Sequence, residues 1–212
     1  MVAMSAYIME QVADRRAAKV PGDDLITRFV VAEQDGQSLD DEDILRVVTQ
    51  LLVGGNETTT SLITNCVWRL LQDRSLWERV VADPNLVNAA IEESLRFDPP
   101  VLGLYRTTTH DVELHGKRIP ENAKVMLHYA AANRDPEAFD DPDVFSLDRP
   151  QRRHLAFGLG VHFCLGSELA RLEGRTALST LIRRFPKLSL EDDGERIKPF
   201  FLWGRRRLPV RT

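Results

Sequence analysis

One cysteine in this 212-residue chain has neighbours that would make its thiol reactive. Cys164 lies in a glycine-rich loop, residues 157–166, and glycines permit backbone conformations that other residues resist. A helical pattern begins directly after the loop, so its free N–H groups and dipole favour a thiolate on Cys164. Cys66 stands instead in an apolar helical segment beside Val67 and Leu70, and we predict that it is an inert core residue.

A second unusual segment is residues 54–60, Gly-Gly-Asn-Glu-Thr-Thr-Thr, in the middle of a long helical pattern. Each glycine costs a helix about 1 kcal/mol relative to alanine, and each threonine costs several tenths of that. One explanation is close packing of another helix over the glycines. The other is that a flat ligand approaches the bare backbone, with the acid Glu57 and the alcohol Thr58 beside it to handle protons.

A third pattern is made of charged residues. Glu93 and Arg96 are three residues apart on a predicted helix, and alone they would be an ordinary surface pair worth a few tenths of a kcal/mol. Arg149 lies in residues 133–154, a long irregular segment rich in aspartate and containing three prolines. A segment of that length without regular structure usually has a function, such as holding a ligand.

Taken together, these patterns resemble the cytochrome P450 family. Residues 55–58 look like its oxygen-activating helix motif, and Glu93-x-x-Arg96 with Arg149 looks like its ion-pair network. Four motifs in the family's order are far more specific than any one of them. The family's cysteine signature is matched at Phe157, Gly158, Gly160, His162, Cys164 and Gly166.

The resemblance implies catalytic and cofactor-binding roles. Cys164 would bind the iron of haem b as a thiolate, and its electron donation would favour O–O cleavage of dioxygen, the co-substrate. Thr58 and Glu57 would be catalytic and would relay protons to the bound oxygen. Arg106 and His162 would bind the haem propionates through charge-assisted hydrogen bonds; the less favoured alternative for Arg106 is an exposed surface residue.

The remaining roles are binding and support. Gly55, Phe157, Gly158 and Gly166 would also contact the cofactor, and Glu93, Arg96 and Arg149 would hold the proximal side together. His154 either hydrogen-bonds nearby backbone or is simply structural. Residues 102–104 either line the substrate pocket or are structural.

The predicted fold is mainly α with small β-sheets, and it corresponds to the C-terminal, haem-binding portion of the cytochrome P450 fold. A hairpin is expected around His115-Gly116 and a strand at residues 125–129. A capping box at Ser38 is expected to begin the long helix. Helices are expected at about residues 4–19, 25–33, 38–72, 75–81, 85–97 and 167–184.

We expect residues 1–212 to form one partial domain of four segments. These are short helices (1–37), the long oxygen-activating helix (38–72), the Glu-x-x-Arg helix with strands and meander (73–149), and the cysteine loop with the final helix and tail (150–212). The length is about half of that expected for the family, so we expect a fragment, a truncated reading frame or a degenerate copy.

Composition excludes several classes of protein. The 43% hydrophobic and 28% charged content is that of a soluble globular protein, and a net charge of -4 leaves no basic footprint for nucleic acid. No stretch approaches the roughly 20 apolar residues that span a bilayer. Two cysteines make no disulfide framework, which favours a reducing, cytoplasmic setting.

Three functions remain to be compared. The first is a haem-thiolate monooxygenase that inserts one oxygen atom into a small organic substrate. His162 makes the chain resemble soluble bacterial members, and resemblance then implies a ferredoxin-type electron donor. The second is a haem-binding or inactive remnant with no turnover. The third is a metal-dependent hydrolase using His154, His162 and Cys164, which is disfavoured because a carboxylate base and the usual zinc spacing are missing.

Overall fold

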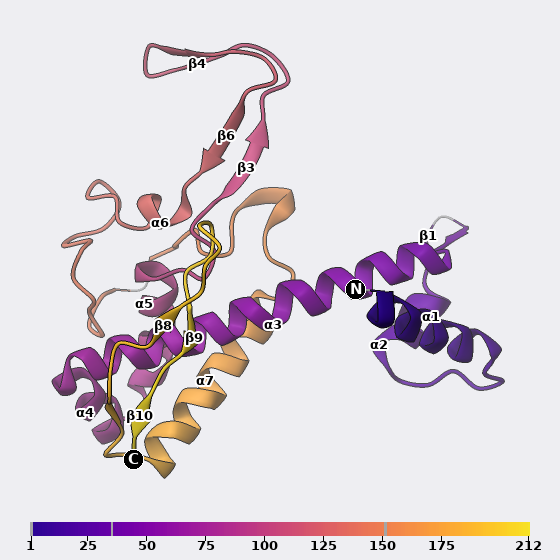
Figure 1. Cartoon of the computed structure of the whole chain (residues 1–212). Coiled ribbons are helices and arrows are strands. Elements are labelled where there is room, and N and C mark those ends of the chain that lie inside the picture. Colours follow the sequence, from indigo (N-terminus) through magenta and orange to yellow (C-terminus); the bar gives the residue numbers. More distant parts are fainter. Residues whose placement is uncertain (1, 35, 151) are drawn as a thin grey trace. The chain divides into compact units, whose positions relative to one another are not determined.

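The structure, a computed structural model, describes residues 2–34, 36–150 and 152–212. The chain divides into two compact units, residues 1–57 and 58–212. Most of the regular structure is helical, and each sheet in the described residues has two strands (Figure 1). The prediction of a mainly α fold with small sheets is therefore confirmed. No helix in the described residues is long and apolar enough to cross a membrane.

The first unit contains two short helices, a small hairpin and the start of a long helix. Its elements are α1 (Val2–Ala17), α2 (Leu25–Val31), β1 (Glu33–Gln34), β2 (Gln37–Ser38) and the first part of α3 (Asp41–Gln72). Helix α3 continues without a break into the second unit. Side chains of α1 and α3 form a separate small core of Ile8, Val12, Ile44 and Val48.

Two predicted boundaries in this unit are wrong. Helix α2 ends at Val31, because Glu33 pairs with Ser38 in the β1–β2 hairpin. For the same reason Ser38 cannot cap α3. Asp40 does so instead, since its carboxylate accepts a hydrogen bond from the Asp43 N–H at 2.7 Å.

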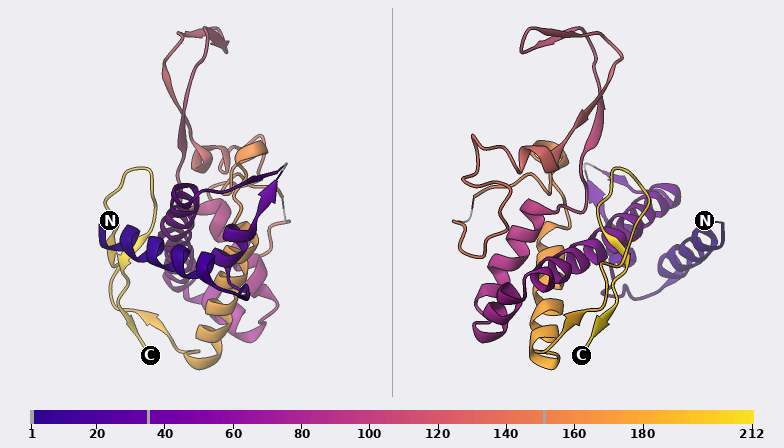
Figure 2. Two further views of the ribbon diagram at one scale, coloured as in Figure 1. Left: turned by 90° about the vertical axis from the view of Figure 1, so that its right-hand side faces the viewer. Right: turned by 60° about the vertical axis from the view of Figure 1, so that its left-hand side comes forward.

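The second unit has its core between four helices, the later part of α3, α4 (Arg74–Ala82), α5 (Leu86–Phe97) and α7 (Ser167–Arg184). Figure 2 shows α7 beside α4 and α5. Gly174 lets α7 approach closely, because a Cβ there would lie 3.1 Å from Ile91 Cδ1 and 3.4 Å from Leu62 Cδ2. Large side chains such as Trp77, Ile91 and Leu178 fill this core.

A two-stranded ribbon extends from these helices and ends in a hairpin (Figure 1). It consists of β3 (Leu104–Thr107) and β6 (Lys124–Leu127), with β4 (Val112–Leu114) and β5 (Lys117–Ile119) at the tip. The predicted hairpin is confirmed. His115 and Gly116 have φ of 49° and 70°, as a tight two-residue hairpin turn requires.

The end of the ribbon differs from the prediction. The strand expected at residues 125–129 stops at Leu127, because α6 (Tyr129–Ala132) begins there and the His128 ring accepts the Ala131 N–H at 3.1 Å. Strand β3 was not predicted. Residues 133–150 and 152–154 contain no helix or strand, as expected.

The tail of the chain crosses α3 (Figure 2). The Asn65 amide on α3 donates to the carbonyls of Trp203 (2.9 Å) and Asp98 (3.1 Å), which ties the tail to the end of α5. Trp68 donates its indole N–H to Asp193 at 3.1 Å. The tail strands are β7 (Ser189–Leu190), β8 (Glu195–Arg196), β9 (Arg205–Arg207) and β10 (Val210–Arg211).

The contact between α3 and the tail gives a prediction about stability. A Cβ on Gly204 would collide with Ser61 Oγ and lie 2.6 Å from Ser61 Cβ. Gly204→Ala should therefore lower the free energy of unfolding by about 1–3 kcal/mol, the usual cost of overpacking. In a Ser61→Gly background the same change should cost much less. Urea unfolding of the four chains measures both, and equal costs in the two backgrounds would contradict this contact.

Candidate functional site

The Cys164 loop is closed by a backbone hydrogen bond, in which the Cys164 N–H donates to the Phe157 carbonyl at 2.9 Å. Gly158 and Gly160 have φ of 70° and 73°, so the turn needs glycine at both positions. Gly166 has a φ of -84°, so its backbone conformation does not require glycine. A Cβ on Gly166 would meet nothing within 4 Å, so that position faces open space.

The two cysteines have opposite environments. Cys164 is exposed, and α7 begins three residues after it at Ser167. Cys66 is buried, as predicted, and its thiol lies 3.7 Å from the Ala90 carbonyl. Burial raises the pKa of the Cys66 thiol to about 12, despite a hydrogen bond with Ser94 that lowers it. Cys164 is therefore the accessible thiol in the described part of the chain.

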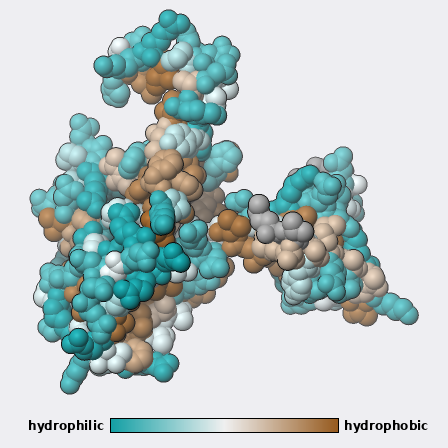
Figure 3. Space-filling view, in the orientation of Figure 1, coloured by the Kyte–Doolittle hydropathy of each residue, from teal (hydrophilic) through white to brown (hydrophobic). Residues whose placement is uncertain are grey.

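The surface around Cys164 is unusually apolar. Val161 is 97% exposed and Leu165 is 90% exposed, and large apolar side chains at such exposure indicate a surface that a ligand or partner covers. Figure 3 shows further apolar surface on the β3–β6 ribbon. The other exposed apolar side chains of the loop, of α7 and of the ribbon are Leu159, Phe163, Leu169, Leu172, Leu104, Tyr105 and Leu127.

Two basic side chains of the second unit are exposed as well, Arg106 on β3 and His162 in the loop. Among the described residues, Arg106 donates only to the Tyr105 carbonyl, at 2.9 Å. Its other N–H groups are available to a carboxylate. An exposed thiol, apolar surroundings, open space at Gly160 and Gly166 and exposed basic side chains together fit haem, a flat apolar cofactor with two propionates.

The unusual middle of α3 is regular helix throughout residues 54–60. A Cβ on Gly54 would meet only the Gln50 side chain, at 3.8 Å, and one on Gly55 would meet nothing within 4 Å in the described chain. Close packing of another helix therefore does not explain these glycines. Glu57 is exposed in the first unit, and Thr58 is half-buried at the start of the second.

Glu93 is the centre of a buried ion-pair network. Its carboxylate accepts two hydrogen bonds from Arg96, at 2.7 and 2.8 Å, and one from Arg149 at 3.1 Å. The Ser146 N–H donates to it at 3.0 Å. The side chains of Glu93 and Arg96 are only 4% and 3% exposed. Arg96 also donates to the Asn133 carbonyl at 2.9 Å, so the network fastens the irregular segment to α5.

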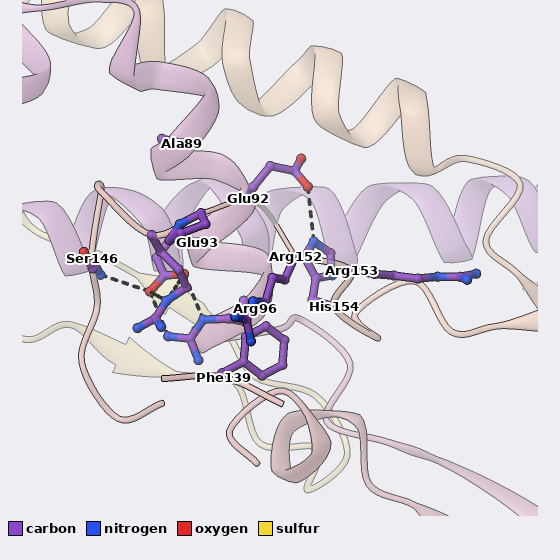
Figure 4. A pocket seen from close by; sticks show the side chains of 11 residues that line it. Ala89, Glu92, Glu93, Arg96, Phe139, Ser146, Arg152, Arg153 and His154 are labelled. Carbon is purple, nitrogen blue, oxygen red and sulfur yellow. Dashed lines mark hydrogen bonds and ion pairs between the residues drawn. The ribbon is translucent and has the colours of Figure 1, made fainter. Parts of the chain in front are cut away.

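A cavity of about 270 Å³ adjoins this network and is drawn in Figure 4. There the Glu92 side chain points toward His154, whereas Glu93 points toward Arg96 and Ser146. His154 Nε2 lies 3.2 Å from Glu92, and Nδ1 accepts the Ala156 N–H at 3.3 Å. His154 thus binds nearby backbone, the first of the two roles considered for it.

The arrangement bears on two other interpretations. Among the described residues no group of three His, Cys, Asp or Glu side chains could hold a metal ion, so His154, His162 and Cys164 do not form such a group there. Gly103 has a packing role, because a Cβ there would collide with the Leu127 carbonyl. The Leu102 N–H donates to the Phe201 carbonyl at 2.8 Å, so these residues connect the ribbon with the tail.

Comparison with known proteins decides the family. The family model described as Cytochrome P450 matches residues 2–207. The chain belongs to the cytochrome P450 family. It is 44% identical over 211 residues to erythromycin C-12 hydroxylase of Saccharopolyspora erythraea, covering 98% of this chain and 53% of that protein. It is 40% identical to a steroid C26-monooxygenase of Mycolicibacterium smegmatis, covering 98% and 52%.

Solved cytochrome P450 structures share the fold. Substrate-free CYP109E1 from Bacillus megaterium matches with a TM-score of 0.94 and 37% identity, over 99% of this chain and 54% of that one. Its complex with testosterone matches with a TM-score of 0.93 and 37% identity, over 99% and 58%. The chain spans about half the length of the curated relatives it matches.

Sequence reasoning missed two residues of this candidate site, Glu92 and Arg171. Arg171 on α7 donates to Glu92 at 2.7 and 3.2 Å, and its guanidinium carbon lies 4.7 Å from the centre of the Phe157 ring. The signal in the sequence that could have identified Glu92 is its place directly before Glu93. Adjacent residues on a helix point in different directions, so Glu92 needs a partner of its own.

The Glu93 network gives a second prediction. Glu93→Gln leaves the buried charges of Arg96 and Arg149 uncompensated, so it should lower the free energy of unfolding by about 3 kcal/mol or more. The control is Glu78→Gln, which breaks the exposed Arg74–Glu78 pair (2.9 Å) and should cost less than about 1 kcal/mol. Urea unfolding followed by circular dichroism compares them, and similar losses would contradict the central role of Glu93.

Proposed function

We propose that this chain is the haem-binding portion of a monooxygenase that inserts one oxygen atom from dioxygen into a small organic substrate. The observation that carries the proposal is the exposed Cys164 thiol, held in a glycine-shaped loop of a cytochrome P450 chain. Haem b supplies the binding and reductive activation of dioxygen. Cys164 would hold the iron as a thiolate, and its electron donation would favour this chemistry.

The residues of this chain would hold the cofactor in complementary ways. Cys164 would ligate the iron, and the apolar loop with Phe157 would cover the porphyrin. Gly166, where a Cβ would meet nothing within 4 Å, would leave room for a flat ring, and we also assign contacts with the cofactor to Gly158 and Gly55. Arg106 and His162 would donate hydrogen bonds to the propionates, because both are exposed cations or donors suited to carboxylates.

Proton delivery would fall to the middle of α3. Thr58 carries a hydroxyl that can both donate and accept a hydrogen bond, and Glu57 beside it is exposed to solvent. An exposed acid next to a half-buried alcohol can pass protons inward from water. This is general acid–base assistance at the oxygen that must be protonated.

The relatives support a proposal for the substrate class, and the resemblance at His162 supports one for the electron donor. Erythromycin C-12 hydroxylase and steroid C26-monooxygenase are named for the oxidation of erythromycin and of steroids, and CYP109E1 has been solved with testosterone. A small organic substrate is therefore the class proposed for this chain. Electrons would come from a ferredoxin-type iron–sulfur protein, as in soluble bacterial members that carry histidine at the position of His162.

A second candidate is haem binding without turnover. It is supported by the coverage of the comparisons, because the chain spans about half the length of the curated relatives it matches. Haem loading with no substrate oxidation would support this candidate over the first.

Replacing the proposed ligand tests the central claim. After haem loading and reduction under carbon monoxide, the wild-type chain should show the red-shifted Soret band of thiolate ligation. Cys164→Ala should abolish that band, whereas Cys66→Ala should keep it, since Cys66 is buried in the core. A colourless wild-type protein, even after reconstitution with haem, would overturn the proposal.

The proton-relay role is tested by Thr58→Ala. The variant should keep its haem and spectrum but divert reducing equivalents to hydrogen peroxide, so that product per NAD(P)H falls about tenfold or more. Thr60→Ala, two residues further along the same helix, is the control and should stay coupled. Peroxide and product are measured with surrogate redox partners, and normal coupling in Thr58→Ala would remove Thr58 from the mechanism.

A further inference from the structure

Glu92 lies next to the Glu93 network but takes part in a different set of contacts. Its carboxylate accepts hydrogen bonds from Arg171 on α7 and from His154 in the segment before the cysteine loop. Burial alone would raise the pKa of Glu92, but these hydrogen bonds outweigh it and hold the pKa at about 2. The side chain is 21% exposed and carries its charge at neutral pH.

The contact with His154 has a defined direction. The Ala156 N–H can only donate, so His154 Nδ1 is the acceptor, and the ring proton lies on Nε2, which donates to Glu92. The His154 side chain is only 6% exposed. Glu92 therefore orients a buried ring that holds the backbone one residue before Phe157.

The contact with Arg171 reaches the same place from α7. Its guanidinium lies over the Phe157 ring, 4.7 Å from the centre. The Phe157 ring also meets Phe163 of the loop edge-on, with the ring centres 6.4 Å apart. The Phe157 carbonyl accepts the Cys164 N–H, and the His154 ring also lies beside the Phe157 ring, with the centres 6.0 Å apart. Both partners of Glu92 therefore contact the residue that closes the cysteine loop.

We propose that Glu92 is a positioning residue for the Cys164 loop, acting through His154 and Arg171 on Phe157. That this presents the thiolate to the iron rests on the proposed haem-binding function. The role is separate from that of Glu93, whose partners Arg96 and Arg149 hold the irregular segment.

Loss of the carboxylate would release both supports together. The buried His154 Nε2–H would lose its acceptor, and an unsatisfied buried donor is costly. Arg171 would keep only Glu168, which is 81% exposed and holds it weakly. The guanidinium would then be free to leave the Phe157 ring.

The test is Glu92→Gln with Glu168→Gln as the matched control, because both acids pair with Arg171. The new side-chain amide would offer a single carbonyl oxygen to donors that now share two carboxylate oxygens. Hydrogen–deuterium exchange of the haem-free 212-residue chain should show peptides covering residues 155–166 opening about tenfold faster in Glu92→Gln. Wild type and Glu168→Gln should agree, and equal exchange in all three would overturn the proposal.

A second readout uses the haem-loaded protein. In the reduced carbon monoxide complex, Glu92→Gln should lose the red-shifted Soret band faster than either reference as the temperature is raised. If the wild type never shows this band, the haem-thiolate function fails, while the exchange result still decides whether Glu92 holds the loop.

If circular dichroism shows that Glu92→Gln does not fold, Arg171→Lys replaces it in the exchange experiment. This variant keeps the charge but loses the second hydrogen bond and the stacking, and exchange at the wild-type rate would count against the proposal.

Discussion

The second unit depends on a buried charge, the Glu93 carboxylate, which is shared by Arg96 and Arg149. Removing ions from water is expensive, and the cost is offset only when geometry and hydrogen bonding are nearly complete. Here the two guanidinium groups also donate to backbone carbonyls of the irregular segment, among them those of Asn133, Pro142 and Val144. The part of this segment from Asn133 to Arg149, which contains no helix or strand, is thereby given a fixed path after α6.

The cysteine loop depends on this path at one end and on α7 at the other. The Asn133 side chain accepts the Leu155 N–H at 2.6 Å, just ahead of Phe157. Gly174 brings α7 against Ile91 on α5, the helix that also carries Glu92 and Glu93. The position of the Cys164 thiol is therefore determined largely by contacts of α5, a helix far upstream of it in the sequence.

Sequence was sufficient where local chemistry decides the structure. Helix α7 begins and ends at the predicted residues, and the His115-Gly116 turn forms because those residue types tolerate positive φ. The sequence was insufficient where contacts with residues far along the chain determine the structure. Strand β3 exists through its pairing with β6, and Ser38 is drawn into a hairpin that leaves Asp40 to cap α3. Glu92 looked like any helical acid, since Arg171, its main partner, lies 79 residues away.

The β3–β6 ribbon has a consequence for behaviour in solution. In the described residues each of its strands pairs on one side only, so the outer backbone N–H and C=O groups present a template to another strand. Leu104, Tyr105 and Leu127 are exposed on the same ribbon, and charge is supplied mainly by Arg106 and Lys124. Strand-to-strand association of separate chains would begin at this edge. Lysine substitutions on the ribbon would add like charges that repel a second chain, which would help to keep the protein monodisperse.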